Sequence, residues 1–285
     1  MNQKIIAVLI AATFGVVACG SDSDMPAAES SLPAVADGYT YPTGVDDVVI
    51  EFVQVGGFVP RELAFQSTPS VLVSGDGRTF GPGAQIAIYP GPLLPAVQVQ
   101  SISDQAIQTI LSAADDAGLF SQIEYDQPTD IADAATARLT INVNGQTYVH
   151  EAYALNWSMP GESGTESTPE RQALADFIGQ LSDLAALVGA EELGEQTIFD
   201  PADFGIEAIV VDDPSMFGSD GIEPTILDWP STVGVRLSDA DSCTVVPADE
   251  VGATLNEANQ LTFFVDADVT YQVLAKPILP GTSCD

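Results

Sequence analysis

The chain has 285 residues, 46% of them hydrophobic, and its 41 acidic and 7 basic side chains give a net charge of −34. The apolar content excludes a chain that is disordered for lack of core-forming residues, and the length suffices for one large domain or two ordinary ones. The charge excludes a general nucleic-acid binder and electrostatic adhesion to anionic lipid, because both require clustered lysine and arginine.

The first 18 residues have the pattern of a signal peptide. Lys4 lies in a short basic start, and residues 5–17 form a largely apolar run. This run is too short to span a bilayer, which needs about 20 apolar residues, but it fits the core of a signal peptide.

The apolar run ends in Val16-Val17-Ala18-Cys19, which resembles the lipobox of bacterial lipoproteins. The resemblance implies that Cys19 becomes the first residue of the mature chain and carries fatty acyl groups such as palmitate. Two acyl chains on one residue give stable membrane residence, so we expect the protein on the outer face of the bacterial cell membrane. The alternative is an ordinary secretory signal in which the cysteine is incidental.

Residues 19–45 are rich in Ser, Asp, Ala, Pro and Gly and lack apolar periodicity, so they predict a flexible acidic tether. With Cys19 assigned to lipid, Cys243 and Cys284 remain as a pair, and a disulfide between them is expected outside the cytoplasm. Two free thiols are the alternative.

The globule begins with strands and turns. Residues 48–55 predict a strand, and residues 70–74 and 79–80 predict two more strands on either side of the turn Gly75-Asp76-Gly77-Arg78. The turn lacks the Gly-Lys-Ser/Thr ending and the following helix of a phosphate-binding loop. Prolines in residues 89–95 predict an extended surface connection.

Two helices follow from capping and apolar spacing. Ser103 is the expected cap of a helix over residues 104–117, which stops at Gly118. Thr168-Pro169-Glu170 opens a second helix whose apolar stripe extends to Val188 and stops at Gly189.

Between the helices, residues 136–143 and 146–154 predict a β-hairpin around Asn144-Gly145, the preferred two-residue turn. This turn fixes the register. The expected pairs are Val143 with Gln146, Ile141 with Tyr148, Leu139 with His150, Ala137 with Ala152, Arg138 with Glu151, Thr140 with Val149 and Asn142 with Thr147.

The last third predicts strands over residues 206–211 and 232–237, a helix over 248–258, and a final hairpin of 261–265 with 269–274. The expected fold class is α+β, with antiparallel hairpins, helices packed on the sheet and strand-strand-helix units repeated. Residues 46–189 form one expected unit, and residues 190–285 form a second, β-rich unit packed against it.

The body from Asp46 onward resembles uncharacterised secreted proteins and lipoproteins of high-GC Gram-positive bacteria. This family brings no activity with it. The resemblance rests on Gly56-Gly57-Phe58-Val59-Pro60, Gly75-Asp76-Gly77-Arg78, Ile86-Ala87-Ile88-Tyr89-Pro90-Gly91-Pro92, residues 113–119 and Asn259-Gln260-Leu261-Thr262.

A single histidine and three cysteines exclude most zinc sites and any disulfide-dense scaffold. His150 is the only imidazole, and the expected hairpin register places it on the more apolar face, where a structural role is the simpler interpretation. The alternative is a hydrolase whose site assembles from distant carboxylates or from His150 as the base.

Carboxylates gather in several loops and could bind a hard cation. Calcium takes six to eight oxygen ligands from such loops, and Glu124, Asp126, Asp130 and Asp133 form the best candidate site. That site would make the protein a calcium-dependent adhesion module. The simpler interpretation is a solvated acidic coat, in which case no cofactor is expected.

The anchor pattern, the tether and the lack of a catalytic motif lead to one main hypothesis. We expect a non-enzymatic, lipid-anchored extracytoplasmic protein that presents an α+β domain for binding or envelope interaction. Its partners are then the membrane, through lipid on Cys19, and a protein or envelope ligand.

Overall fold

The computed structural model describes residues 38–155, 168–218 and 221–284, which belong to one compact unit that begins at Gly38. The predicted signal peptide, Cys19 and most of the tether lie outside the described residues. Among the described helices, none combines the length and the apolar character needed to cross a membrane.

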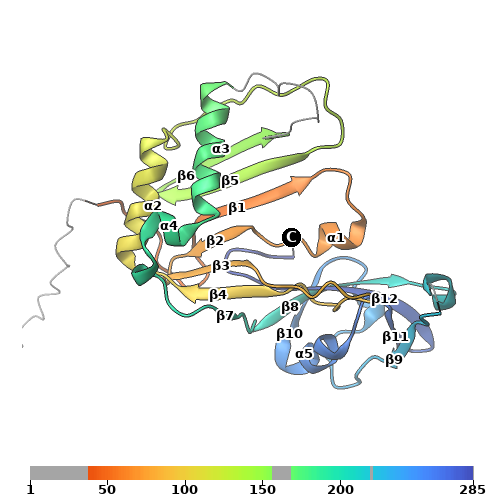
Figure 1. The fold of residues 1–285 in the computed structure, drawn as a ribbon. Coiled ribbons are helices and arrows are strands. Elements are labelled where there is room, and N and C mark those ends of the chain that lie inside the picture. Colours follow the sequence, from red (N-terminus) through yellow and green to blue (C-terminus); the bar gives the residue numbers. More distant parts are fainter. Residues whose placement is uncertain (1–37, 156–167, 219–220, 285) are drawn as a thin grey trace, which may run out of the picture. The chain divides into compact units, whose positions relative to one another are not determined.

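The first sheet has seven strands in the order β6-β5-β1-β2-β3-β4-β7, and every neighbouring pair is antiparallel (Figure 1). The edge strand β7 comes from a part of the chain that follows the helices packed on this sheet. In chain order the strands are β1 (Val48–Gly56), β2 (Val71–Ser74), β3 (Arg78–Pro82), β4 (Val97–Ser101), β5 (Ala135–Val143), β6 (Gln146–Tyr153) and β7 (Thr197–Ile198).

The second sheet has five strands in the order β10-β8-β12-β11-β9, and its edge strand β9 pairs with β11 in parallel. The other pairs are antiparallel. The strands are β8 (Asp203–Val210), β9 (Thr225–Asp228), β10 (Thr244–Pro247), β11 (Thr262–Asp266) and β12 (Val269–Pro277).

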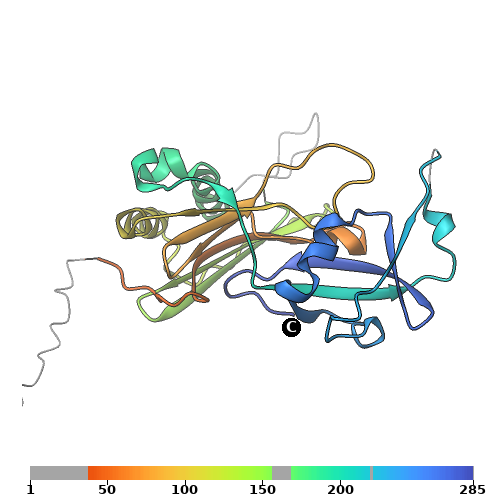
Figure 2. The ribbon, with the colours of Figure 1, turned by 90° about the horizontal axis from the view of Figure 1, so that it is seen from below.

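Helices cover the sheets, and the predicted α+β class is confirmed. Figure 2 shows α2 and α3 on the same side of the first sheet, and α5 lies against the second. The helices are α1 (Arg61–Phe65), α2 (Asp104–Asp116), α3 (Pro169–Leu181), α4 (Leu184–Val188) and α5 (Ala248–Glu257), with short 3₁₀ turns η1 (Ala190–Glu192), η2 (Pro214–Phe217) and η3 (Leu237–Asp239).

Each sheet has its own apolar core, formed where alternate strand residues meet the stripe of a helix. In the first sheet, Ile50, Leu139 and Ile141 pack with Ile107 and Ile110 of α2. The second core unites β8, β11, β12 and α5 through side chains such as Phe204, Ile206, Val251, Leu255, Phe264 and Val273. Burial of these faces supplies the main stabilisation of both halves.

The predicted hairpin is confirmed pair by pair. Asn144 and Gly145 form the turn with positive φ angles of 52° and 71°, and all seven expected pairs occur in the register of β5 with β6. The side chains of Arg138 and Glu151 form an ion pair across the strands at 2.6 Å.

Two expectations for secondary structure are wrong. The helix predicted through Val188 ends at Leu181, because Asp183 caps a new helix by accepting a hydrogen bond from the Ala186 N–H at 3.1 Å. Residues 232–237 form no strand; they cross the second core as a loop that buries Val233 and Leu237.

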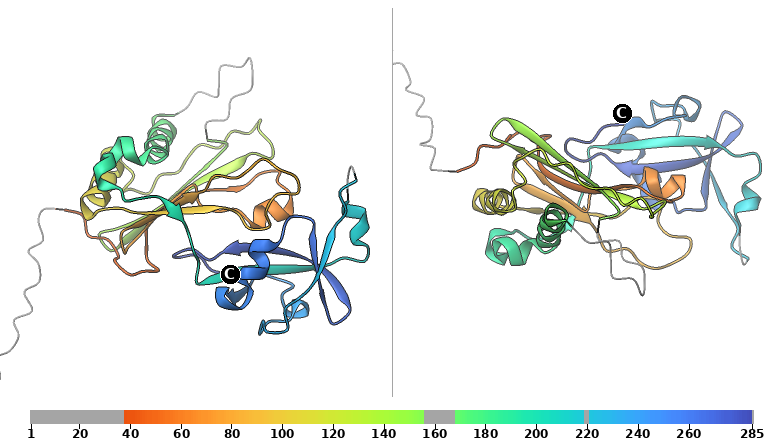
Figure 3. Two further views of the ribbon diagram at one scale, coloured as in Figure 1. Left: turned by 60° about the horizontal axis from the view of Figure 1, so that its bottom comes forward. Right: turned by 90° about the horizontal axis from the view of Figure 1, so that it is seen from above.

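The two sheets meet at α1 and at the loop between β3 and β4 (Figure 3). Gln66, directly after α1, donates from its side chain to the carbonyl oxygen of Leu93 at 2.6 Å. Arg61 of α1 forms an ion pair with Glu207 of β8. A small apolar cluster of Leu72, Phe80, Val97 and Leu279 continues the contact between the halves.

The expected disulfide joins Cys243 to Cys284 across 41 positions of the chain and connects the C-terminal segment to the start of β10. It lies over Gly205 of β8, where an added Cβ would come within 3.0 Å of both sulfur atoms. The absence of a side chain at this position therefore makes room for the disulfide.

Removing this disulfide with Cys243→Ser and Cys284→Ser is expected to lower the free energy of unfolding by about 3–4 kcal/mol, because the unfolded chain regains the entropy of the closed loop. Denaturant titration of both proteins measures the difference. Dithiothreitol should destabilise the parent protein by a similar amount and leave the double variant unchanged. Equal unfolding midpoints for parent and variant would contradict the prediction.

Candidate functional site: an apolar groove beside helix α5

His150 is wholly buried in β6, and both of its ring nitrogens are engaged. Nε2 lies 2.8 Å from the carbonyl oxygen of Leu119, which can only accept, so Nε2 carries the hydrogen. Nδ1 then accepts from the hydroxyl of Tyr125 at 2.9 Å. The imidazole joins β6 to the end of α2 and to the following loop.

Burial also sets the protonation of this pair. Desolvation lowers the pKa of His150, which keeps the imidazole neutral, and it raises the pKa of Tyr125 to about 12. A buried ring with two satisfied nitrogens cannot reach a substrate. The structure therefore supports the structural interpretation of His150 and not the role of a hydrolytic base.

The loop proposed for calcium runs from α2 to β5 and carries its carboxylates on the outside. The side chains of Glu124, Asp126, Asp130 and Asp133 are exposed. Among the described residues, no three or more His, Cys, Asp or Glu side chains lie close enough together to hold a metal ion. The structure thus does not bring these carboxylates into a common site, and calcium binding stays a prediction.

Arg171 holds the acidic loop in place, a role that the sequence analysis missed. Its side chain, 6% exposed, donates to the carbonyl oxygens of Asp126 at 2.8 Å, Tyr153 at 2.9 Å and Ala154 at 3.2 Å. Desolvation lowers its pKa. The available signal was an arginine three residues before Leu174, on the buried face of α3.

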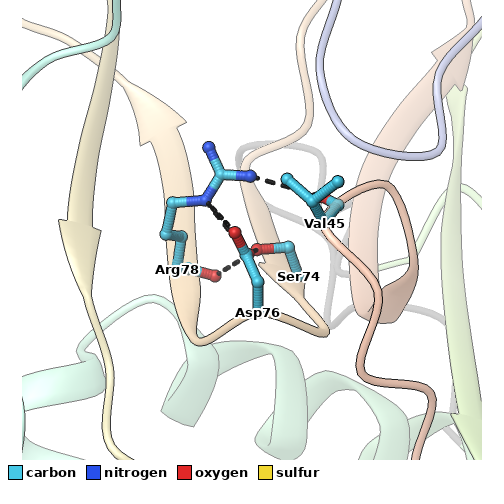
Figure 4. A network of polar contacts seen from close by, with 4 residues as sticks. All are labelled: Val45, Ser74, Asp76 and Arg78. Atoms are coloured by element: carbon cyan, nitrogen blue, oxygen red, sulfur yellow. Dashed lines mark hydrogen bonds and ion pairs between the residues drawn. The ribbon is translucent and has the colours of Figure 1, made fainter.

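The glycine-rich turn between β2 and β3 has a structural role, as its sequence predicts. Figure 4 shows Arg78 donating to the carboxylate of Asp76 and to the carbonyl oxygen of Val45, at 2.8 and 3.2 Å. Ser74 donates to the same carboxylate at 2.6 Å. With its one cation paired in this way, the turn holds the segment before β1 and offers no site for phosphate.

A groove of about 810 Å³ lies where the β3–β4 loop, the segment after β7 and helix α5 come together; we call it the α5 groove. Most of its wall is apolar. The lining residues are Ala84, Gln85, Ile86, Pro92, Leu94, Pro95, Ala96, Val97, Ile198, Phe199, Asp200, Pro201, Phe204, Ala248, Gly252, Ala253, Leu255, Asn256 and Pro277.

Backbone hydrogen bonds hold the walls of the groove. The base of the β3–β4 loop is closed by the N–H of Gly83 donating to the carbonyl oxygen of Ala96 at 2.8 Å. Near its far end, the N–H of Leu93 donates to the carbonyl oxygen of Ala258, directly after α5, at 3.1 Å. Loop and helix are therefore connected, and the groove is a feature of the folded unit.

Small residues on α5 create the hollow itself. Ala248, Gly252 and Ala253 share the face of the helix that lines the groove, and Gly252 packs against Phe204. On the opposite rim Ile198 is 80% exposed, and Ile86 of the β3–β4 loop is exposed as well. Exposed aliphatic side chains around an apolar hollow are typical of a surface that binds another molecule.

The polar chemistry of the groove is sparse. Among the described residues that line it, Gln85, Asp200 and Asn256 are the only ones whose side chains carry hydrogen-bonding groups, and none is cationic. Such a wall offers contact area and a few orienting hydrogen bonds. An anionic ligand would meet the Asp200 carboxylate without a compensating positive charge.

Comparison with family models, with curated proteins and with solved structures yielded no match to this chain.

The lowered pKa of His150 predicts how stability depends on pH. An unfolded histidine takes up a proton below about pH 6.5, whereas the buried imidazole resists it, so stability from this group is complete above about pH 6.5 and is lost as the pH falls toward the folded-state pKa. Because His150 is the only histidine, NMR titration of its imidazole reads the native pKa directly.

The matched control is His150→Gln, which keeps hydrogen-bonding groups at this position and does not titrate in this range. The parent should lose stability relative to His150→Gln between about pH 7 and pH 5, although carboxylates titrate in both proteins. A native imidazole midpoint at or above the ordinary histidine value would contradict the prediction.

Proposed function

We propose that this protein is a lipid-anchored extracytoplasmic binding protein without enzymatic activity, and that the α5 groove is its ligand site. The groove is the observation that carries the proposal. Its volume of about 810 Å³ falls within the range of small-molecule sites, about 300–1,000 Å³, and its walls are mainly apolar.

The anchoring part of the proposal is supported by the lipobox-like pattern at Cys19 and by the disulfide. Disulfides persist in oxidising compartments outside the cytoplasm, and the Cys243–Cys284 bond is of that kind. The strongly acidic surface agrees with a globule kept away from an anionic membrane by repulsion. The lipid would then hold the chain while the groove remains available to a ligand.

The groove favours a neutral, largely apolar ligand. Aliphatic and proline side chains supply contact area, and Gln85 and Asn256 can orient one or two polar groups. Asp200 is the only carboxylate among the described lining residues, whereas glycoside hydrolysis generally requires two carboxylates flanking the bond. Together with the buried state of His150, this favours binding over hydrolysis.

The lipid assignment predicts that Cys19→Ala releases the protein from the membrane fraction, because the acylated sulfur is lost. Fractionation of cells and detection of the protein in pellet and medium measures this. The double variant Cys243→Ser, Cys284→Ser is the matched control and should stay in the pellet. Retention of Cys19→Ala in the membrane would rule out lipid on this residue.

Filling the groove should block binding of a neutral apolar probe. Ala253→Trp places an indole in the hollow and should weaken binding of N-phenyl-1-naphthylamine by about tenfold or more, since loss of about 1.4 kcal/mol suffices. Fluorescence titration measures the affinity. Ala186→Trp, at an exposed position of α4 outside the groove, is the control; equal binding by both variants would place the probe elsewhere.

A further inference from the structure

The edge strand β9 of the second sheet is short, open and unusually apolar for an edge. It pairs with β11 on one side, in the parallel register Ile226 with Phe263 and Leu227 with Phe264. In the described part of the sheet no strand lies on its other side. All four of its residues are exposed.

The hydrogen bonds of β9 show which backbone groups face the open edge. The N–H of Thr225 donates to the carbonyl oxygen of Leu261 at 2.9 Å, and the N–H of Trp229 donates to that of Val265 at 2.8 Å. Because a strand alternates with a period of two, Leu227 also faces β11. The N–H and C=O groups of Ile226 and Asp228 therefore point outward.

Apolar side chains line this edge. Ile226 is 55% exposed and Leu227 is 39% exposed. Phe217 of η2 packs on the ring of Phe263, with the ring centroids 5.1 Å apart, and Phe263 is the register partner of Ile226. Ile226 and the Phe217–Phe263 pair thus belong to one face of the sheet, and Met216 beside them is 82% exposed.

The charge around β9 is negative. Asp228 lies in β9, and Glu223 lies two residues before the start of this strand. Asp212 and Asp213 precede η2. Arg236, the cation of the loop that follows β9, is already paired with Asp266 at 2.7 Å. A second copy of this chain would bring the same carboxylates and a net charge of −34, so self-pairing at this edge is disfavoured.

We propose that β9 is a docking edge for an extended segment of another protein, in which a β-branched apolar residue and a basic residue stand two positions apart and therefore share one face. The segment would add as a strand, with its backbone bonded to the outward groups of Ile226 and Asp228. Its apolar side chain would lie on Ile226 and Phe217, and its basic side chain, on the same face, would meet Asp228. The edge supplies affinity through the backbone, and the charges select the partner.

The probe is a short synthetic peptide that carries valine and lysine two positions apart with a neutral residue between them, titrated into the full-length protein in detergent and followed by fluorescence anisotropy. Saturable binding that weakens with sodium chloride is expected. Ile226→Pro removes the outward N–H without touching the bonds to β11 and should weaken binding by about tenfold, whereas Ile226→Val should bind like the parent.

Any cationic peptide could adhere to so acidic a protein. The decisive comparison therefore tests whether the affinity depends on the backbone N–H groups of the peptide. The same peptide with N-methyl groups on its edge-facing amides keeps its charge but should bind about tenfold more weakly. This comparison uses the parent protein and stays valid if Ile226→Pro unfolds. Equal affinity of the two peptides, or no binding by either, would overturn the proposal.

Amide exchange locates the binding strand. On addition of the lysine-valine peptide, the N–H groups of Ile226 and Asp228 should become protected, because they gain hydrogen-bond partners. Those of Thr225 and Leu227 already face β11 and should change little. Protection that leaves Ile226 and Asp228 unaffected and appears at β6 or β10 would assign the peptide to a different edge and refute the role of β9.

Discussion

Scarcity of positive charge constrains this fold. Against 41 carboxylates the chain has seven cations, and each of the six in the described part of the chain holds a contact between elements. Arg61 connects α1 to β8, Arg78 fixes the segment before β1, and Arg171 binds the loop after α2 to the end of β6. Arg138 joins β5 to β6, Arg236 connects its loop to β11, and Lys276 lies over the ring of Phe65.

This use of cations explains the character of the surface. Surface ion pairs are individually weak, but four of the six described cations are ion-paired, Arg171 binds carbonyl oxygens and Lys276 lies over Phe65. The unpaired charge of the described residues is therefore acidic. Molecules that approach the α5 groove or the β9 edge therefore encounter carboxylates without competing cations. Neutral and basic partners are favoured over anionic ones at both places for the same electrostatic reason.

The sequence predicted best those elements whose bounds are set by residues adjacent in the chain, such as turn and capping residues. Asn144-Gly145 determined the hairpin register because a two-residue turn leaves a single alignment of the strands. Ser103 and Gly118 bounded α2, through a cap and a positive φ angle of 75°. The break in the predicted helix at residues 182–183 was missed because the apolar stripe continued across it, although Asp183 is a good N-cap residue.

The candidate site was beyond the reach of local patterns. The walls of the α5 groove come from residues such as Ile86, Phe199 and Ala253, which are brought together only by the meeting of the two sheets. The strands β7, β9 and β10 are two to four residues long and bear no clear alternation, whereas β4 alternates valine with glutamine and was missed all the same. Arg171 was missed because its partners are backbone carbonyls, which leave no trace in side-chain patterns.

The placement of the cations also determines how the folded chain meets proteases that cut after lysine or arginine. Such enzymes need a segment of backbone that can be drawn into an active-site cleft, as exposed loop tips can. Arg78 and Arg138 lie in strands with neighbours on both sides, Arg171 is buried in α3, and Lys276 is followed by proline. In the described residues this leaves the bonds after Arg61 and Arg236, so the strands, the buried helix face and the proline together leave trypsin-like enzymes only these two positions in the folded chain.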